Sequence, residues 1–177
     1  KGGKSAKDAL TDFNLNIPKG SIYGLLGPNG AGKSTFINIL GGLVKKNSGE
    51  INICGINIDT DAKASRKKIG IVPQELNIDP FFTPIELLEL QAGLYGVAKK
   101  NRKSEEILSN VGLLDQRNAY ARTLSGGMRR RLLVAKSLVH DPEIIVLDEP
   151  TAGVDVNLRN SLWAYIKRLN DKGTTIC

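Results

Sequence analysis

Hydrophobic and polar residues alternate in short runs over the first part of the chain, and a two-residue period of this kind predicts β-strands. Isoleucines flank Gly55 on both sides, which indicates a small antiparallel hairpin. A helix is expected over residues 36–43, directly after a glycine-rich stretch. The strands predicted in this part are residues 12–17, residues 21–26 as a buried strand, the hairpin within 51–58, and residues 69–72.

The middle of the chain changes to helical spacing. Thr83, Pro84 and Glu86 give three helix-start signals: an N-cap, a proline at the first helical position and a capping box. Ser125 is expected to cap a further helix. The expected helices run from Thr83 to Tyr95, over 104–111, from Ser125 to Val139 and over 159–169, with strands over 143–147 and from Thr174. In the last helix, Trp163 and Ile166 are expected to pack inward.

Strands and helices thus alternate at both ends of the chain, around a mainly helical block. This order predicts an α/β fold, in which a parallel-sheet core holds a helical insertion. The 177 residues suit one domain. Apolar residues make up 41% and charged residues 24%, values that exclude the disordered and disulfide-rich classes. No run approaches the ~18 apolar residues of a membrane span, so any membrane role is expected to be peripheral.

Two features indicate a partial domain, truncated at both ends. The only methionine is Met128, so Lys1 is not a translation start, and the last predicted strand runs up to Cys177. The two cysteines, Cys54 and Cys177, have no metal-ligand spacing and form no evident disulfide framework. With no export signal, a reducing compartment is expected.

A formal charge of +7 is spread over several basic runs, of which residues 129–131 are three consecutive arginines. Solvated surface is the plainest interpretation, and attraction to anionic lipid or nucleic acid is the alternative. Aromatic residues make up only 5%, which argues against a base-stacking surface for single-stranded nucleic acid. Because the runs are scattered, the charge does not choose between these interpretations.

The strongest chemical signal is a segment of the form G-x-x-x-x-G-K-[ST] between a predicted strand and a predicted helix. Its glycines let backbone N–H groups surround phosphate oxygens, and the following helix aims its positive end at the same anion. Lys33 can reach the outer phosphates, the Ser34 hydroxyl suits Mg²⁺, and Thr35 adds a donor near the inner phosphate. The residues predicted to bind the nucleotide are Gly27, Pro28, Asn29, Gly30, Ala31, Gly32, Lys33, Ser34 and Thr35.

Two acids follow the apolar strand over 143–147. In a parallel sheet, Asp148 and Glu149 emerge at the carboxyl end of that strand, beside the phosphate loop. Asp148 suits Mg²⁺ through water, and Glu149 suits a general base that orients an attacking water. A surface turn after a buried strand is the structural alternative for this pair.

A second anion-binding helix start is predicted where two glycines follow a serine N-cap. Two such sites in one chain are explained if the second serves a neighbour's nucleotide. The segment consists of Leu124, Ser125, Gly126, Gly127 and Met128.

With these motifs in this order, the sequence resembles the nucleotide-binding domain of the ATP-binding cassette (ABC) family over essentially its whole length. The resemblance implies a P-loop NTPase (RecA-like) core over residues 1–75 and 140–177, with a small antiparallel part. It also implies an inserted helical subdomain over 76–139. Gln74 corresponds to the family's glutamine that senses Mg²⁺ and the attacking water, and Asp155 to an aspartate that crosses the dimer interface.

The family implies two cassettes packed head to tail around two ATP molecules, as a homodimer or pseudo-dimer. The phosphate loop of one subunit holds ATP, and segment 124–128 of the other, which corresponds to the family's signature, closes over the γ-phosphate. Binding drives closure and hydrolysis drives opening. The implied catalytic residues are Glu149 and Gln74, and the implied Mg²⁺ ligands are Ser34, Gln74 and Asp148.

The segment after Glu149, with Arg159 and Trp163, is similar to bacterial exporters whose membrane subunit is a separate polypeptide. The similarity implies an ATP-hydrolysing transport subunit, peripheral on the cytoplasmic face of the inner membrane. Its helical subdomain would dock a transmembrane permease, and no nucleic acid is expected as a partner. Phe81 and Phe82 are expected to face the permease, or else to lie buried under the helical block.

The chain departs from the family pattern at several positions. The signature usually continues with glutamine where Met128 stands, and neither the switch histidine nor the adenine-stacking aromatic is found in the sequence. The single histidine, His140, is interpreted as a surface residue at a helix end. The chain by itself is therefore expected to bind Mg-nucleotide weakly and to hydrolyse it poorly.

Other functional classes are weaker alternatives. A soluble ABC ATPase acting on ribosomes or DNA is favoured only by the basic charge. The signature segment 124–128, at the start of its own helix, argues against a P-loop kinase. Intact Lys33, Asp148 and Glu149 argue against a non-catalytic regulatory cassette.

Overall fold

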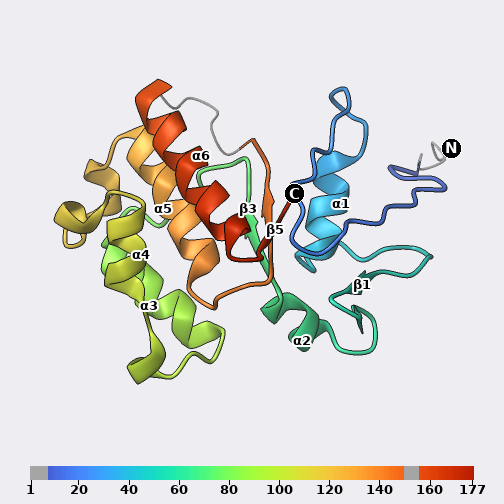
Figure 1. The fold of residues 1–177 in the computed structure, drawn as a ribbon, viewed down its shortest axis with the longest axis horizontal. Helices are drawn as coiled ribbons and strands as arrows, with labels where there is room; N and C mark the ends of the chain where they lie inside the picture. The colour runs from blue at the N-terminus through green and yellow to red at the C-terminus, as the bar shows by residue number, and fades with distance from the viewer. Residues whose placement is uncertain (1–7, 150–155) are drawn as a thin grey trace, which may run out of the picture.

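The computed structural model describes residues 8–149 and 156–177, and a parallel three-stranded sheet lies at its centre (Figure 1). The sheet has the order β3-β4-β5, and Ile22 adds a parallel bridge to Ile176 beyond β5. The segment that leads to the phosphate loop therefore continues the sheet, and the predicted α/β class is confirmed. The strands are β3 (Ile69–Val72), β4 (Ile144–Leu147) and β5 (Thr175–Ile176).

The two faces of the sheet carry different side chains, and different helices pack against them. In β4, Ile145 clusters with residues of α5 (Gly126–Leu138) and α6 (Val156–Asp171), whereas Val146 clusters with α1 (Lys33–Leu40). This alternation is the two-residue period of a strand that is buried on both faces. Figure 1 shows the sheet between α5 and α6 on one side and α1 on the other.

Contact between α5 and the sheet depends on a glycine of β3. A Cβ at Gly70 would collide with the carbonyl oxygen of Ser137 and lie 3.1 Å from Pro142 Cγ. A side chain at this position would push α5 away from the strand, so Gly70 sets how closely the helix approaches.

The helical block lies where the sequence predicted it. α3 (Pro84–Leu94) begins after Thr83, whose hydroxyl accepts from the Glu86 N–H while the Glu86 carboxylate accepts from the Thr83 N–H. This is the predicted capping box. α4 spans Ser104–Asn110, and the serine before α5 is its N-cap, as expected. The shorter helices are α2 (Ala62–Lys67), η1 (Lys99–Asn101), η2 (Leu114–Gln116) and η3 (Ala121–Thr123).

A hydrophobic cluster joins the helical block to the sheet. Leu88 of α3, Leu108 of α4, Leu132 of α5 and Ile166 of α6 are at most 1% exposed and belong to it. Each such side chain contributes about 1.5–3 kcal/mol through burial. Among the described residues, no helix has the length and apolar character that a membrane span needs.

The predicted hairpin is present as β1 (Asn52–Ile53) and β2 (Ile56–Asn57), paired antiparallel. Cys54 and Gly55 join the strands with φ values of 51° and 79°. Positive φ at both central residues is the requirement of a two-residue type I′ turn, and glycine meets it without strain.

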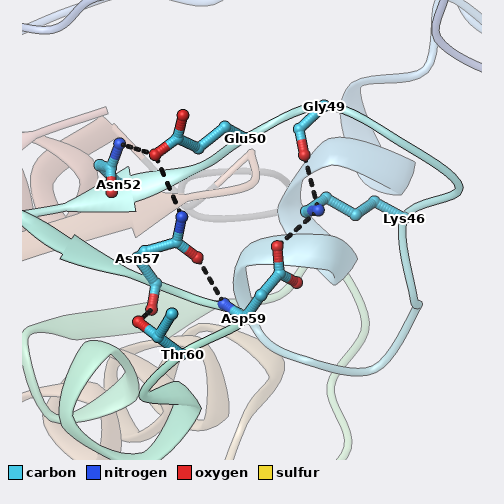
Figure 2. Close-up of polar contacts among 7 residues, drawn as sticks. All are labelled: Lys46, Gly49, Glu50, Asn52, Asn57, Asp59 and Thr60. Atoms are coloured by element: carbon cyan, nitrogen blue, oxygen red, sulfur yellow. Dashed lines mark hydrogen bonds and ion pairs between the residues drawn. The ribbon is translucent and has the colours of Figure 1, made fainter.

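A polar network holds the loops around this hairpin (Figure 2). Glu50 Oε1 accepts hydrogen bonds from the side chains of Asn52 and Asn57, which lower the pKa of the Glu50 carboxyl. Lys46 Nζ donates to the carbonyl oxygen of Gly49 at 2.7 Å and pairs with Asp59 Oδ2 at 2.6 Å. The hairpin is therefore tied to the loop that follows α1.

Two predicted strands are not formed as expected. Residues 12–17 form no strand, and within 21–26 only Ile22 makes a β-bridge. Ile22 and Leu26 are 56% and 93% exposed, so this segment is not buried either. β5 exchanges backbone hydrogen bonds with Ser21 and Tyr23 of this segment. A strand extends only where neighbouring backbone can pair with it.

Two side chains also lie differently from their predicted places. Trp163 is 41% exposed, because Leu162 and Ile166 occupy the buried stripe of α6. His140 is half-buried instead of lying on the surface, and its ring stacks on Tyr95 with centroids 3.7 Å apart. Sequence spacing could not reveal this contact, since Tyr95 comes from the end of α3.

Candidate functional site

The sheet brings three of the predicted motifs to one edge. Residues 21–23 run parallel to β5, and β3, β4 and β5 are parallel to one another. The phosphate loop, Gln74 and the acid pair each follow the carboxyl end of one of these segments. In open parallel sheets, ligands bind beyond the carboxyl ends of the strands.

The phosphate loop turns into α1 through left-handed glycines. Gly30 and Gly32 have φ values of 81° and 88°, and Gly32 is the N-cap of α1. A Cβ at Gly32 would lie 2.6 Å from the carbonyl oxygen of Ala9, so a larger residue would not fit there. Gly32 supplies no side-chain cap, and α1 has no acid in its first turn. The helix start is therefore an open and positive site for an anion.

Lys33 lies across the loop that precedes it. Its Nζ donates to the carbonyl oxygens of Gly27 at 2.6 Å and Pro28 at 3.0 Å. The ammonium group is thus held at the loop where phosphates are predicted to bind. Ser34, at the exposed start of α1, is one residue further on.

The acid pair contacts the segment after β3. Val72 pairs with Leu147 in the parallel register, and the Asp148 N–H donates to the Val72 carbonyl at 2.9 Å. One step further, Gln74 Nε2 donates to Glu149 Oε2 at 3.0 Å. Glu149 is exposed and has a φ of 49°, which is uncommon for a residue other than glycine. The two predicted catalytic side chains are therefore in direct contact.

The signature segment presents its polar part to solvent. Ser125 Oγ accepts from the Met128 N–H at 3.2 Å, and both Ser125 and Gly126 are exposed. Leu124 is only 5% exposed and packs into the core cluster. The leucine side chain therefore anchors the segment, so any contact it makes with a ligand is through its backbone. Asp155 lies outside the described residues.

The residues predicted to hold Mg²⁺ carry suitable oxygen donors. The Ser34 hydroxyl, the Asp148 carboxylate and the Gln74 amide oxygen are hard oxygen ligands, the type that Mg²⁺ prefers. The Gln74 nitrogen is used on Glu149, so the amide oxygen is the atom left to face a cation. Over residues 8–149 and 156–177, no group of three or more His, Cys, Asp or Glu could hold a metal. A cation here would need further oxygens, and nucleotide phosphates supply them.

One residue at this edge was missed in the sequence. Arg130 is 4% exposed, and its Nη1 donates to the carbonyl oxygen of Pro73 at 2.8 Å. Solvated surface, the plainest interpretation of the run 129–131, is wrong for Arg130. Its spacing of four and seven residues from the buried Val134 and Ser137 was the available signal.

The chain matches the family model described as "ABC transporter" over residues 10–152. It is 39% identical to the linearmycin resistance ATP-binding protein LnrL of Bacillus subtilis, over 96% of this chain and 55% of the relative. It is 40% identical to the Nod factor export ATP-binding protein I of Cupriavidus pinatubonensis, over 94% and 52% of the two chains. The daunorubicin/doxorubicin resistance ATP-binding protein DrrA of Streptomyces peucetius is 38% identical, over 95% and 52%. The chain thus spans about half the length of the curated relatives it matches.

Solved structures give the same result for the fold. The dimeric post-hydrolysis state of the ATP-binding cassette MJ0796, bound to ADP and Pi, superposes with a TM-score of 0.83 and 34% identity. That match covers 98% of this chain and 82% of the cassette. The fold is therefore that of a P-loop ATPase cassette, and the chain belongs to the ABC transporter family.

Proposed function

We propose that this chain binds and hydrolyses ATP as the energy-supplying subunit of an exporter. The observation that carries the proposed hydrolysis is the 3.0 Å contact between Gln74 and Glu149, at the sheet edge that also carries the Lys33 loop. The export and resistance ATP-binding proteins among the relatives support the transport role. A phosphate cradle, a carboxylate base and an amide that orients the base are the parts that phosphoryl transfer to water requires.

Each side chain has a distinct role in the proposed reaction. Lys33, the loop N–H groups and the start of α1 bind the phosphates. Glu149 accepts the proton of a water whose oxygen attacks the γ-phosphorus, while the bond to the β-phosphate oxygen breaks and ADP leaves. Gln74 donates to the same carboxylate and so fixes its orientation. Mg²⁺, held by Ser34, Asp148 and Gln74, would neutralise charge on the phosphate oxygens.

The remaining part of the site comes from a second cassette. Ser125 and Gly126 are exposed at the start of α5, whose backbone N–H groups form a second anion site. We place the nucleotide of the opposing subunit here, with Asp155 crossing the same interface. The dimeric cassettes among the solved relatives support this arrangement.

The membrane subunit is proposed to dock on the helical segment 76–139. Phe81 is 66% exposed, whereas Phe82 packs against the core cluster, so the two phenylalanines have different roles. The Arg122 guanidinium lies 5.5 Å from the Phe81 ring centroid and 5.2 Å from that of Tyr120. An exposed aromatic pair around a cation is a compact docking point for a partner. A permease at this surface would place the chain on the cytoplasmic face of the membrane.

A comparison of ATP turnover by the wild type and the Glu149→Gln variant tests the proposal. Glutamine keeps the size and polarity of the side chain but cannot accept the proton. We expect turnover to fall by about 10²–10⁴-fold, the usual contribution of a positioned base, with ATP binding retained. If ATP turnover is unchanged by the substitution, Glu149 is not the general base of the reaction.

A further inference from the structure

We infer that Arg130 is a positioning residue for ATP hydrolysis, which ties the signature helix α5 to the catalytic pair Gln74–Glu149. The inference rests on the proposed function. It adds a link between the surface that meets a partner's nucleotide and the base that acts on the chain's own nucleotide. Three observations support it: the place of the hydrogen bond, the burial of the cation, and the position of Arg130 in its helix.

The hydrogen bond from Arg130 is made directly beside the catalytic glutamine. β3 ends at Val72, whose carbonyl is used by the Asp148 N–H. The next carbonyl, that of Pro73, accepts from Arg130 Nη1 at 2.8 Å. Gln74 follows immediately and reaches Glu149. Arg130 therefore holds the backbone at the point where the chain leaves the sheet to present Gln74.

The burial of Arg130 is hard to explain by stability alone. Its side chain is 4% exposed, whereas the neighbouring Arg129 and Arg131 are only partly buried. No ion pair over 8–149 and 156–177 includes it. Burial of a cation is costly when no carboxylate compensates, and an apolar residue of similar size is often at least as stable. Destabilising features of this kind are typical of functional sites.

The position of Arg130 in α5 supplies the link. It lies in the second turn after the Ser125 cap, so a rigid helix connects it to the exposed start of the signature. A displacement of that start by a bound phosphate would move Arg130, and with it Pro73 and Gln74. A rigid helix that contacts a ligand at its start and the catalytic segment in its second turn can transmit a small shift from one to the other.

The neighbouring Arg131 provides a matched control. Its Nη1 also donates to main-chain carbonyls, those of Val111 at 2.7 Å and Gly112 at 2.9 Å. These carbonyls belong to the end of α4, away from β3 and Gln74. Arg130→Met and Arg131→Met therefore remove the same cation from adjacent positions, and the first breaks the hydrogen bond to Pro73 beside the catalytic pair.

The test measures kcat and KM for ATP, with thermal melting, in Arg130→Met, Arg130→Gln, Arg130→Lys and Arg131→Met. We expect both neutral Arg130 variants to remain folded, with kcat reduced by about ten- to a hundredfold through misplaced catalytic groups and KM little changed. Lysine can make the single hydrogen bond to Pro73 and should restore most of kcat. Arg131→Met should change kcat by less than about threefold while it lowers the melting temperature.

A double-variant cycle separates positioning from a general structural role. If Arg130 acts through Gln74, then Arg130→Met should lower kcat no further in a Gln74→Ala background. The inference would be overturned if the losses in kcat of the two single variants multiply in the double variant. It would also be overturned by an unchanged kcat in Arg130→Met or by unfolding of both neutral Arg130 variants. If the wild type itself hydrolyses no ATP, or Glu149→Gln stays active, the proposed function fails and this inference fails with it.

Discussion

The side-chain amide of Gln74 donates to the carboxylate of Glu149 across 3.0 Å, although 75 residues separate them in the sequence. The register of β3 against β4 creates this contact, because Val72 pairs with Leu147. Gln74 and Glu149 each lie two residues beyond this pair, so they leave the sheet side by side. The pair gives the proposed base a fixed orientation.

Shortening Gln74 should therefore lower catalysis more than binding. Gln74→Asn keeps the amide but shortens the side chain by one methylene, so the donor no longer reaches Glu149. We expect kcat to fall by about ten- to a hundredfold in Gln74→Asn and in Gln74→Ala, with ATP affinity changed far less. Steady-state kinetics and fluorescent-nucleotide titration measure the two effects. A loss of affinity with kcat unchanged would contradict this, because it would show that Gln74 binds the nucleotide equally in the ground state and the transition state.

Removal of the Lys33 charge should weaken nucleotide binding. The loop carbonyls of Gly27 and Pro28 that Lys33 contacts stay in place in Lys33→Met, but the cation for the phosphates is gone. A charged hydrogen bond contributes about 1.5–3 kcal/mol, so we expect about ten- to a hundredfold weaker ATP binding by calorimetry. Lys46→Met is the control, because Lys46 pairs with Asp59 beside the hairpin (Figure 2). Comparable losses in both variants would indicate non-specific attraction.

Ser125→Asp distinguishes the role of Ser125 as the N-cap of α5 from its proposed role in binding a second nucleotide. Aspartate is as good an N-cap as serine and suits the positive helix end, so the melting temperature should stay within a few degrees. Its charge should repel a γ-phosphate and abolish ATP-driven dimerisation in the Glu149→Gln background. Size-exclusion chromatography with ATP measures this. A normal dimer would place the partner's nucleotide elsewhere.

Gly70→Ala tests how the sheet and α5 fit together. The added methyl group meets the Ser137 carbonyl, so we expect a loss of about 1–3 kcal/mol in the free energy of unfolding, measured with urea. Gly24→Ala is the control, since a Cβ at Gly24 has no atom within 4 Å. If the two substitutions cost the same, the close approach of α5 does not depend on Gly70.

Burial of His140 predicts a pH dependence of stability. Desolvation lowers the pKa of His140 from its ordinary value of 6.5, so below that pH the unfolded chain binds the proton and the folded chain does not. Stability from the neutral ring is therefore complete above pH 6.5 and falls as the pH drops below it. Carboxyls with lowered pKa values, such as Glu50, contribute stability that is complete above their ordinary pKa of 4.5 and is lost only as the pH falls below it.

Urea unfolding at several pH values between 5 and 8 checks this prediction. His140→Gln cannot titrate, so its free energy of unfolding should decline less than that of the wild type below pH 6.5. A Tyr95→Phe variant keeps the stacked ring and should follow the wild type. Parallel curves for the wild type and His140→Gln would assign the pH dependence to other groups.

Features with local causes were predictable from the sequence. The Thr83–Glu86 capping box, the Ser125 cap and the turn at Gly55 each depend on residues within a few positions, and the structure contains all three. The resemblance of the phosphate loop and signature to a known family also identified the fold. That resemblance, and not residue order alone, assigned Gln74 to the same site as the phosphate loop and Glu149.

Features with distant causes were not predictable in this way. Residues 21–26 have the composition of a strand, but pairing depends on how far β5 extends. His140 is half-buried because Tyr95 comes to it from another helix. Arg130 resembles its two arginine neighbours in sequence, and only the packing of α5 against β3 buries it.

The decisive experiment for the transport role measures ATP turnover in lipid vesicles, with and without a polytopic membrane protein encoded beside this chain. We predict that turnover depends on Glu149 and changes when the membrane protein is present. Turnover that ignores the membrane protein and responds instead to ribosomes or DNA would contradict the exporter assignment.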